Sequence, residues 1–398
     1  MMPRISTSLK KLVLLCLLLA YGASSQAWPL SNQAQISLIT VSPGQELYSM
    51  YGHSAIRVQD PVMNLDYVFN YGTFNFNTPN FYVKFVRGKL MYQLAPGYFA
   101  DLKARNIEEN RSIYEQVLHL TPAQKQRVID FLETNYEPQN REYLYDFLKD
   151  NCATRIRDVF KKTLGDSLQY PADIPGTPST YRRMVGIYQA PHPWVDLGVD
   201  LAMGLPSDEK TGVWEAMFLP DYLLASFAKA QLQTPTGPTA FAGPVIKHFE
   251  ASAVPAAQGF FTPMVAFWML FVVVALVTLL QFRSKKASHT LDVVLFSLTG
   301  FLGVFLLFLW LGTDHQSFAT NLNLLWAFPV HLVAGLLLLK KNPPRWLKPY
   351  FLVTGLVLVV LAIAWKFLPQ EYHPSLLPLV LTLALRAFYI WRAQPAHR

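Results

Sequence analysis

Five apolar stretches occupy the last third of the chain and restrict what it can fold into. They cover residues 263–282, 291–312, 322–339, 350–368 and 375–391. Each approaches the ~20 residues that a membrane-spanning helix needs. The chain of 398 residues is 52% hydrophobic and only 15% charged, whereas an ordinary soluble domain is about 25% charged. These features exclude a purely soluble or disordered protein, and they predict an all-α transmembrane domain of five helices over 260–398.

The loops between the apolar stretches predict how the chain is oriented in the membrane. Basic residues follow the first, third and fifth stretches: Arg283, Lys285 and Lys286, then Lys340, Lys341, Arg345 and Lys348, then Arg392 and Arg398. Loops 313–321 and 369–374 contain no lysine or arginine. Because basic loops stay in the cytoplasm, we expect a cytoplasmic C-terminus and an outward-facing region before residue 260. The formal net charge of +8 is partly this topology signal, so we expect no nucleic-acid partner.

The first 27 residues have the pattern of a secretory signal peptide. A basic start, a short apolar run over 12–20 and small residues up to Ala27 predict cleavage after residue 27. The alternative is an uncleaved anchor. The chain has two cysteines, Cys16 and Cys152. Cleavage would leave Cys152 alone, which excludes a disulfide within the mature chain.

Between the signal peptide and the first span, the sequence predicts a mixed α/β domain over 28–230. Alternating apolar residues predict strands at 35–41, 53–58, 67–70 and 89–94. Capping residues predict helices over 122–134 and 151–163. Residues 171–193 are rich in proline and predict a loop. Residues 231–259 are rich in proline, alanine, glycine and threonine, and predict a linker to the membrane.

His53 and Cys152 form the candidate catalytic pair. Cys152 follows Asn151, a preferred N-cap residue, so it would lie in the first turn of a helix, where the helix dipole lowers a thiol pKa. A histidine on a strand that faces such a cysteine is the geometry of papain-type sites. The order of His53 before Cys152 is that of circularly permuted members of that fold. The alternative is a structural histidine and an inert buried cysteine, but an unpaired cysteine in an exported protein favours a functional one.

Two further groups of polar residues are candidates for supporting roles. Asn70, Tyr71 and Asn151 are candidates for orienting the base or donating a hydrogen bond to an oxyanion, and the alternative for Asn70-Tyr71-Gly72 is a simple turn. The candidates for contact with substrate on the membrane side are Arg155, Asp314, His315, Asn321 and Asn323. The alternative for the last four is an ordinary polar end of a membrane span.

Several motifs that mark other chemistries are missing from the sequence. It contains no P-loop, no G-x-G-x-x-G after a strand, no H-E-x-x-H, no C-x-x-C and no G-x-S-x-G. The nine histidines are scattered. We therefore expect no cofactor and no metal site.

Several short motifs follow one another in a fixed order along the chain. The main ones are Tyr51-Gly52-His53-Ser54-Ala55-Ile56-Arg57, Asn70-Tyr71-Gly72-Thr73-Phe74 and Asn151-Cys152-Ala153-Thr154-Arg155. Shorter ones follow at Thr180-Tyr181-Arg182, Pro193-Trp194, Asp196-Leu197-Gly198 and Met217-Phe218-Leu219-Pro220. Together they resemble the Lnb N-terminal periplasmic domain family over roughly 30–230. Asp314-His315, followed by Asn321-Leu322-Asn323-Leu324-Leu325-Trp326, is similar to the membrane region of that family.

This resemblance implies a fold, an activity and partners. The family is named for a bacteroidal lipoprotein N-acyltransferase, so the resemblance implies transfer of a fatty acyl chain to the α-amino group of a lipoprotein. It implies Cys152 as nucleophile, His53 as base, a membrane lipid as acyl donor and a lipoprotein as acceptor. A relation to permuted papain-like proteins such as lecithin retinol acyltransferase is also implied. We therefore expect an α+β permuted papain-like domain in the periplasm, followed by a five-helix domain in the bacterial inner membrane.

Three alternatives to this function stay open at the level of sequence. A periplasmic cysteine peptidase or amidase acting on cell-wall peptides would use the same Cys–His pair, but it has less need for five spans. The second is a protein that binds lipid or lipoprotein without catalysis. The third is a structural membrane scaffold.

Overall fold

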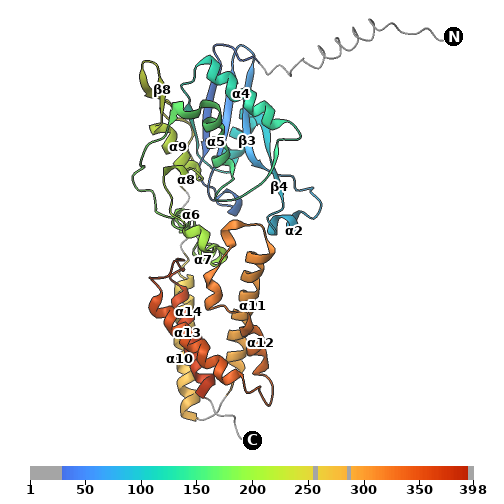
Figure 1. Cartoon of the computed structure of the whole chain (residues 1–398), viewed down its shortest axis with the longest axis vertical. Helices are drawn as coiled ribbons and strands as arrows, with labels where there is room; N and C mark the ends of the chain where they lie inside the picture. Colours follow the sequence, from blue (N-terminus) through green and yellow to red (C-terminus); the bar gives the residue numbers. More distant parts are fainter. Residues whose placement is uncertain (1–28, 254–258, 285–287, 393–398) are drawn as a thin grey trace, which may run out of the picture.

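The computed structural model describes residues 29–253, 259–284 and 288–392. Figure 1 shows an α/β domain stacked on one end of a helical domain, so that the long axis of the molecule runs through both. The predicted signal peptide, which includes Cys16, lies outside the described residues. The basic residues Lys285, Lys286 and Arg398 also lie outside them.

A seven-stranded antiparallel sheet forms the centre of the α/β domain, with the strand order β10-β5-β1-β2-β3-β4-β6. Its strands are β1 (Gln35–Val41), β2 (His53–Asp60), β3 (Leu65–Thr73), β4 (Met91–Tyr98), β5 (Ile113–Val117), β6 (Glu142–Leu144) and β10 (Ile246–Phe249). A smaller sheet holds β7 (Leu168–Gln169), β8 (Gln231–Thr234) and β9 (Gly237–Ala240). The four predicted strands correspond to β1, β2, β3 and β4, and β1 has the predicted bounds.

Helices α4 (Pro122–Tyr136) and α5 (Cys152–Leu164) pack on one face of the large sheet. Both begin at a capping box, Thr121 with Gln124 and Asn151 with Thr154. The sequence predicts the first box and the Asn151 cap, and Thr154 completes the second box. The main core lies between these helices and alternate strand residues such as Ile36. The intervening residues of the same strands point to the opposite face, where they pack with α3 (Phe99–Glu108).

The other helices of this domain connect the strands. They are α2 (Phe81–Val86), α6 (Tyr181–Gln189), α7 (Pro193–Ala202), α8 (Val213–Ala216) and α9 (Pro220–Lys229). Short 3-10 turns are η1 (Leu47–Ser49), η2 (Gly165–Ser167) and η3 (Leu205–Asp208). The predicted loop over 171–193 is wrong in its second half, because Thr180 caps the start of α6 and no proline interrupts that helix.

The predicted linker over 231–259 is wrong over most of its length. Strands β8 and β9 pair as a hairpin, and β10 adds to the edge of the seven-stranded sheet beside β5. The α/β domain therefore continues to Phe249, beyond the predicted end at 230. Pro238 is compatible with β9 because β9 is an edge strand, where a missing backbone N–H does not interrupt a ladder.

The helical domain contains four segments that are long and apolar enough to cross a membrane, within the described residues. They are α10 (Pro263–Ser284), α11 (Thr290–Gly312), Gln316–Leu337 and α13 (Leu347–Ala364). The third is interrupted, and consists of η4 (Gln316–Phe318), η5 (Leu322–Leu325) and α12 (Val330–Leu337). The fifth apolar stretch forms α14 (Leu376–Arg392), which has 17 residues and would rise only about 26 Å. The prediction of five spans thus stays a prediction.

A buried ion pair ties α14 into the helical domain. Arg386 and Asp292 are both fully buried, and their side chains lie 2.6 Å apart. Arg386 also donates to Thr278 and Gln281 of α10. Charges inside a membrane domain are expensive unless they are paired, so these bonds explain how α14 carries an arginine among apolar neighbours.

Candidate active site

His53 and Cys152 lie together where β2 and α5 begin. The chain enters β2 through Gly52, whose φ of +79° is unfavourable for residues with a side chain. A Cβ on Gly52 would lie 2.7 Å from the carbonyl oxygen of Val41, so the turn that leads into His53 requires glycine. Cys152 is the first residue of α5, and a hydrogen bond joins its side chain to the His53 ring.

Asn70 is the third residue of this site. Its Oδ1 lies 3.1 Å from Nε2 of His53, which brings β3 into the site beside β2. A neutral amide oxygen can only accept, so Nε2 carries the hydrogen of this bond. The other ring nitrogen, Nδ1, is then the one available to the thiol of Cys152. The arrangement is a Cys–His–Asn triad, in which each member positions the next.

The site favours a charged pair of thiolate and imidazolium. Burial works against charge on both groups, but the attraction between them and their shared hydrogen bond outweigh it. The pKa of the Cys152 thiol is therefore lowered, and hydrogen bonds from the backbone N–H groups of Ser54 and Ala153 lower it further. The pKa of His53 is raised by Cys152 and by the bond to Asn70. A thiolate is the nucleophilic form of cysteine.

Asn151 holds the helix start rather than reaching into the site. Its Oδ1 accepts from the backbone N–H groups of Ala153 and Thr154, at 2.9 and 3.0 Å. Its Nδ2 donates to the carbonyl oxygens of Phe147 and Phe218. All these bonds are to backbone groups of the same domain. Asn151 therefore fixes the start of α5, and with it the position of Cys152.

The side chains of Tyr71 and Arg155 bond to residues other than His53 and Cys152. The Tyr71 hydroxyl donates to Oδ1 of Asn135 at 2.6 Å. The guanidinium of Arg155 forms a two-pronged ion pair with Asp150 and lies 3.7 Å above the Tyr143 ring. Tyr71 and Arg155 instead line a separate polar cavity of about 340 Å³ between α4 and α5.

The outer-loop candidates Asp314 and His315 join the two domains. The backbone N–H of Asp314 donates to the carbonyl oxygen of Arg87 at 2.9 Å, and its carboxylate lies 3.7 Å from Lys89. His315 Nε2 lies 3.2 Å from the carbonyl oxygen of Phe85. These residues therefore connect the end of α11 to the segment around α2.

Asn321 and Asn323 also serve the junction between the domains. Asn321 Nδ2 donates to the carbonyl oxygens of Leu201 and Ala202, at the end of α7. Asn323 bonds to Leu201 and accepts from the Trp326 indole. Both asparagines are buried and their polar atoms are hydrogen-bonded. In this structure their side chains therefore hold the two domains together.

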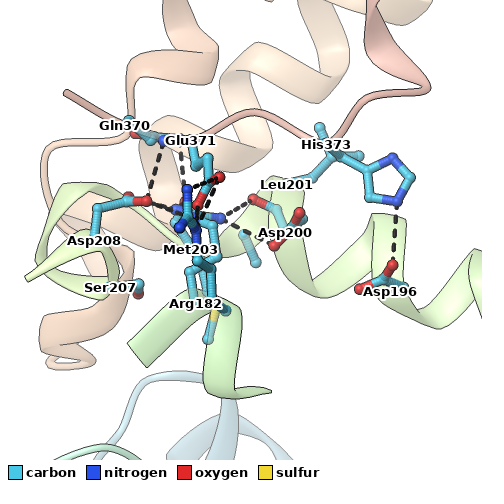
Figure 2. Close-up of polar contacts among 12 residues, drawn as sticks. Arg182, Asp196, Asp200, Leu201, Met203, Ser207, Asp208, Gln370, Glu371 and His373 are labelled. Atoms are coloured by element: carbon cyan, nitrogen blue, oxygen red, sulfur yellow. Dashed lines mark hydrogen bonds and ion pairs between the residues drawn. The ribbon is translucent and has the colours of Figure 1, made fainter. Parts of the chain in front are cut away.

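Arg182 lies on α6, beside the junction, and the sequence does not mark it as a candidate site residue. Figure 2 shows its guanidinium surrounded by Asp200, Asp208 and backbone oxygens. It donates to both carboxylates and to the carbonyl oxygens of Met203 and Gly204. Gln370, from the loop before α14, donates to the same Met203 carbonyl oxygen. The only sequence signal for Arg182 was its place in a family motif.

One group of side chains has the chemistry of a metal site. The ligand atoms of Asp196, Asp200 and His373 lie within 4.8 Å of one another. Burial raises the pKa of Asp200 to about 6. His373 already bonds to Asp196 and Ser375 (Figure 2 shows the first of these), and Asp200 pairs with Arg182. His373 is thus bonded to Asp196 and Asp200 is paired with Arg182, so each of the three side chains already has a partner at the junction.

Comparison with known protein families assigns both domains. Residues 29–185 match the Lnb N-terminal periplasmic domain, and residues 255–395 match the Lnb transmembrane domain. The chain belongs to the Lnb family. It is accordingly a membrane protein with an N-terminal periplasmic domain. No curated protein and no solved structure matches the chain. His53, Asn70 and Cys152 all fall within the part that matches the Lnb periplasmic domain.

Proposed function

We propose that this protein is a thiol acyltransferase that moves a fatty acyl chain from a membrane lipid, through a thioester on Cys152, to the α-amino group of a lipoprotein. The observation that carries the proposal is the triad: His53 bonds to Cys152 on one side and to Asn70 on the other. Membership of the Lnb family supports the choice of reaction. The order of His53 and Cys152 supports a permuted papain-like fold.

The first half of the reaction would load the enzyme. The Cys152 thiolate attacks the ester carbonyl of the lipid, and a C–S bond forms. Backbone N–H groups at the start of α5 would stabilise the resulting oxyanion. The intermediate collapses by breaking the C–O bond, and the departing alkoxide takes the proton from the His53 imidazolium. The products of this half are an acyl thioester on Cys152, a lysolipid and a neutral His53.

The second half would transfer the acyl chain and restore the enzyme. A neutral amine attacks the thioester carbonyl, a C–N bond forms and the C–S bond breaks. His53 takes the proton that the amine loses, so the thiolate–imidazolium pair forms again. Asn70 keeps the ring in position through both halves. The helical domain would hold donor and acceptor in the bacterial inner membrane, which raises their effective concentration near the thiol.

Replacement of Cys152 tests this function. In a bacterial strain that lacks its own lipoprotein N-acyltransferases, wild-type protein is expected to give N-acylated lipoproteins, and Cys152→Ala to give free α-amino groups. Mass spectrometry of lipoprotein N-terminal peptides reads out the difference. Lys161→Ala is a matched control, because Lys161 lies on the same helix and its side chain is exposed.

Two results would decide against the transferase. Equal N-acylation by wild-type and Cys152→Ala protein would remove Cys152 from the reaction. A change in cell-wall peptides that depends on Cys152, with lipoproteins unchanged, would favour the peptidase alternative.

A further inference from the structure

Helix α2 and the turn before it carry an exposed apolar surface. Tyr82 is 78% exposed, Phe76 is 70% exposed, and Val83 and Phe85 are about half exposed. Side chains this large are unusual as neighbours on the surface of a soluble domain, and such patches mark contacts with other molecules or membranes. In the part of the chain that the structure describes, nothing covers this surface.

The contacts of α2 place this surface at the level of the membrane boundary. The Arg87 side chain donates to the carbonyl oxygen of Gly312 at 3.4 Å, and the N–H of Asp314 donates to the Arg87 carbonyl oxygen. Gly312 is the last residue of α11, a membrane span. Figure 1 shows α2 on the side of the α/β domain that faces the helical domain. A short helix held against the end of a span must lie close to the lipid headgroups.

Charge on this segment also fits a lipid surface. Lys84 lies within α2, and Arg87 and Lys89, which also contact Gly312 and Asp314, lie just after it. Basic residues beside aromatic ones are typical of segments that lie in the interface, where the cations meet lipid phosphates and the rings enter the acyl region. The short helix therefore has both parts of an interfacial anchor.

A row of aromatic rings leads from this surface toward the thiol. It is formed by Tyr82, Phe81, Phe74, Tyr92 and Tyr145, and the centroids of successive rings lie 5.3, 5.7, 5.2 and 4.5 Å apart. We call these five residues the aromatic row. Phe76 and Phe85 widen its outer end by packing on Phe81.

Gly72 connects the inner end of the aromatic row to the active site. A Cβ built on Gly72 would lie 3.6 Å from Cε2 of Tyr145 and 3.7 Å from Cβ of Cys152. The last ring of the row and Cys152 therefore both lie next to Gly72, a residue without a side chain. An acyl chain laid along the row would therefore end next to Cys152.

We propose that α2 dips into the adjacent lipid leaflet and that the aromatic row seats one acyl chain of a membrane phospholipid, leading its ester toward Cys152. The seating of the lipid is a binding event and does not require the thiol. Only the last step, reaction of that ester with Cys152, rests on the proposed function.

Photolabelling of the full chain tests this proposal. The Cys152→Ala protein is reconstituted in liposomes of phosphatidylethanolamine and phosphatidylglycerol, which contain a phosphatidylethanolamine with a diazirine in its acyl chain and no lipoprotein. After irradiation, peptide mass spectrometry is expected to find lipid adducts on Tyr82 or Phe85 and on Tyr92 or Tyr145. The combined change Phe76→Ser, Tyr82→Ser and Phe85→Ser is expected to lower labelling of Tyr92 and Tyr145 at least tenfold.

A control variant removes exposed apolar side chains from a different part of the same domain. Val62 and Met63 are 60% and 48% exposed but lie in the turn before β3, at the far end of that strand from α2. Val62→Ser with Met63→Ser should leave labelling of the row unchanged. Adducts confined to the membrane helices would overturn the proposal, as would labelling of the row that appears only after a lipoprotein is added. If the row is labelled but wild-type protein transfers no acyl chain, the lipid seat stands and the transferase fails.

Discussion

The hydrogen bond between Asn70 and His53 orients the base and also favours its charged form. Cys152 raises the pKa of His53 against the effect of burial, and the bond to Asn70 raises it further. Because the Cys152 pKa is lowered, the ion pair exists between a low acid limit, where the thiolate takes up a proton, and a high alkaline limit, where His53 loses one. The two limits belong to the coupled pair rather than to either residue alone.

Replacement of Asn70 by Ala should move the alkaline limit. Loss of the bond that raises the His53 pKa shifts the alkaline limb of a plot of kcat/KM against pH toward lower pH. The plateau should fall about tenfold or more, because a base that is free to rotate is aligned less often. Asn77→Ala, in the exposed loop after β3, is the matched control. An unchanged alkaline limb would show that Asn70 does not act through His53.

The residues of the site could be predicted only in part from the sequence. His53 and Cys152 are recognisable because local signals mark them, a glycine turn before a strand and an N-cap before a helix. The sequence offers both Asn70 and Tyr71 as partners of His53. It cannot decide between them, because the answer depends on which residue of β3 faces His53 on β2. Tyr71 bonds to Asn135 instead, and that contact between distant residues has no local signature.

The N-cap of α5 is the element on which the nucleophile depends. Replacement of Asn151 by Ala removes the acceptor for two backbone N–H groups, and such losses cost about 0.5–2 kcal/mol of stability. Cys152 should also react more slowly with iodoacetamide, because a frayed helix start no longer aims the Ala153 N–H at the sulfur. Asn151→Ser keeps an acceptor at the cap and should recover most of the stability.

Thermal unfolding and the alkylation rate of Cys152 measure these two effects. If Asn151→Ala matches wild type in both, the cap does not hold the nucleophile.

Helices and strands with strong local sequence signals could be predicted, whereas the shortest strands could not. Helices α4 and α5 begin at the predicted capping residues, because capping depends on neighbours within one turn. Strands β8, β9 and β10 have only four residues each. Four residues give too little alternation to distinguish a strand from a linker, and two of the pairings, β10 with β5 and β8 with β7, join segments distant in sequence.

At the scale of the whole molecule, Arg182 holds in place the segment of the α/β domain, residues 200–208, to which Gln370 and Glu371 of the membrane domain bond. It is 4% exposed and bonds two carboxylates and two backbone carbonyl oxygens of the segment that meets the outer loops. Removing one partner of a buried ion pair costs about 3–5 kcal/mol. We therefore expect Arg182→Met to lower the thermal midpoint of the detergent-solubilised protein strongly.

The neighbouring residue provides the control for this prediction. Arg183 forms an ion pair with Glu371 that is exposed on both sides, and exposed pairs contribute at most about 1 kcal/mol. Arg183→Met should therefore change the midpoint little. Equal effects of the two substitutions would contradict the role assigned to Arg182.

The two-domain plan of the molecule could be predicted from the sequence, whereas the junction could not. Apolar stretches of spanning length identify the membrane domain because burial in lipid constrains every residue of a span. The junction depends on single buried polar atoms, such as those of Arg182 and Asn321, whose partners lie on other elements. Their partners are mostly backbone oxygens, and because every residue has one, the sequence does not indicate which oxygen is the partner.

The central claim is that Cys152 carries an acyl chain, and peptide mass spectrometry tests it most directly. The full chain in liposomes with an isotopically labelled phospholipid and no acceptor is quenched in acid and digested. We predict a labelled acyl group on the Cys152 peptide that neutral hydroxylamine releases, that is absent from Cys152→Ala and that is strongly reduced in His53→Ala. Acyl transfer that proceeds with the label on another residue, or with no covalent adduct at Cys152, would contradict the account.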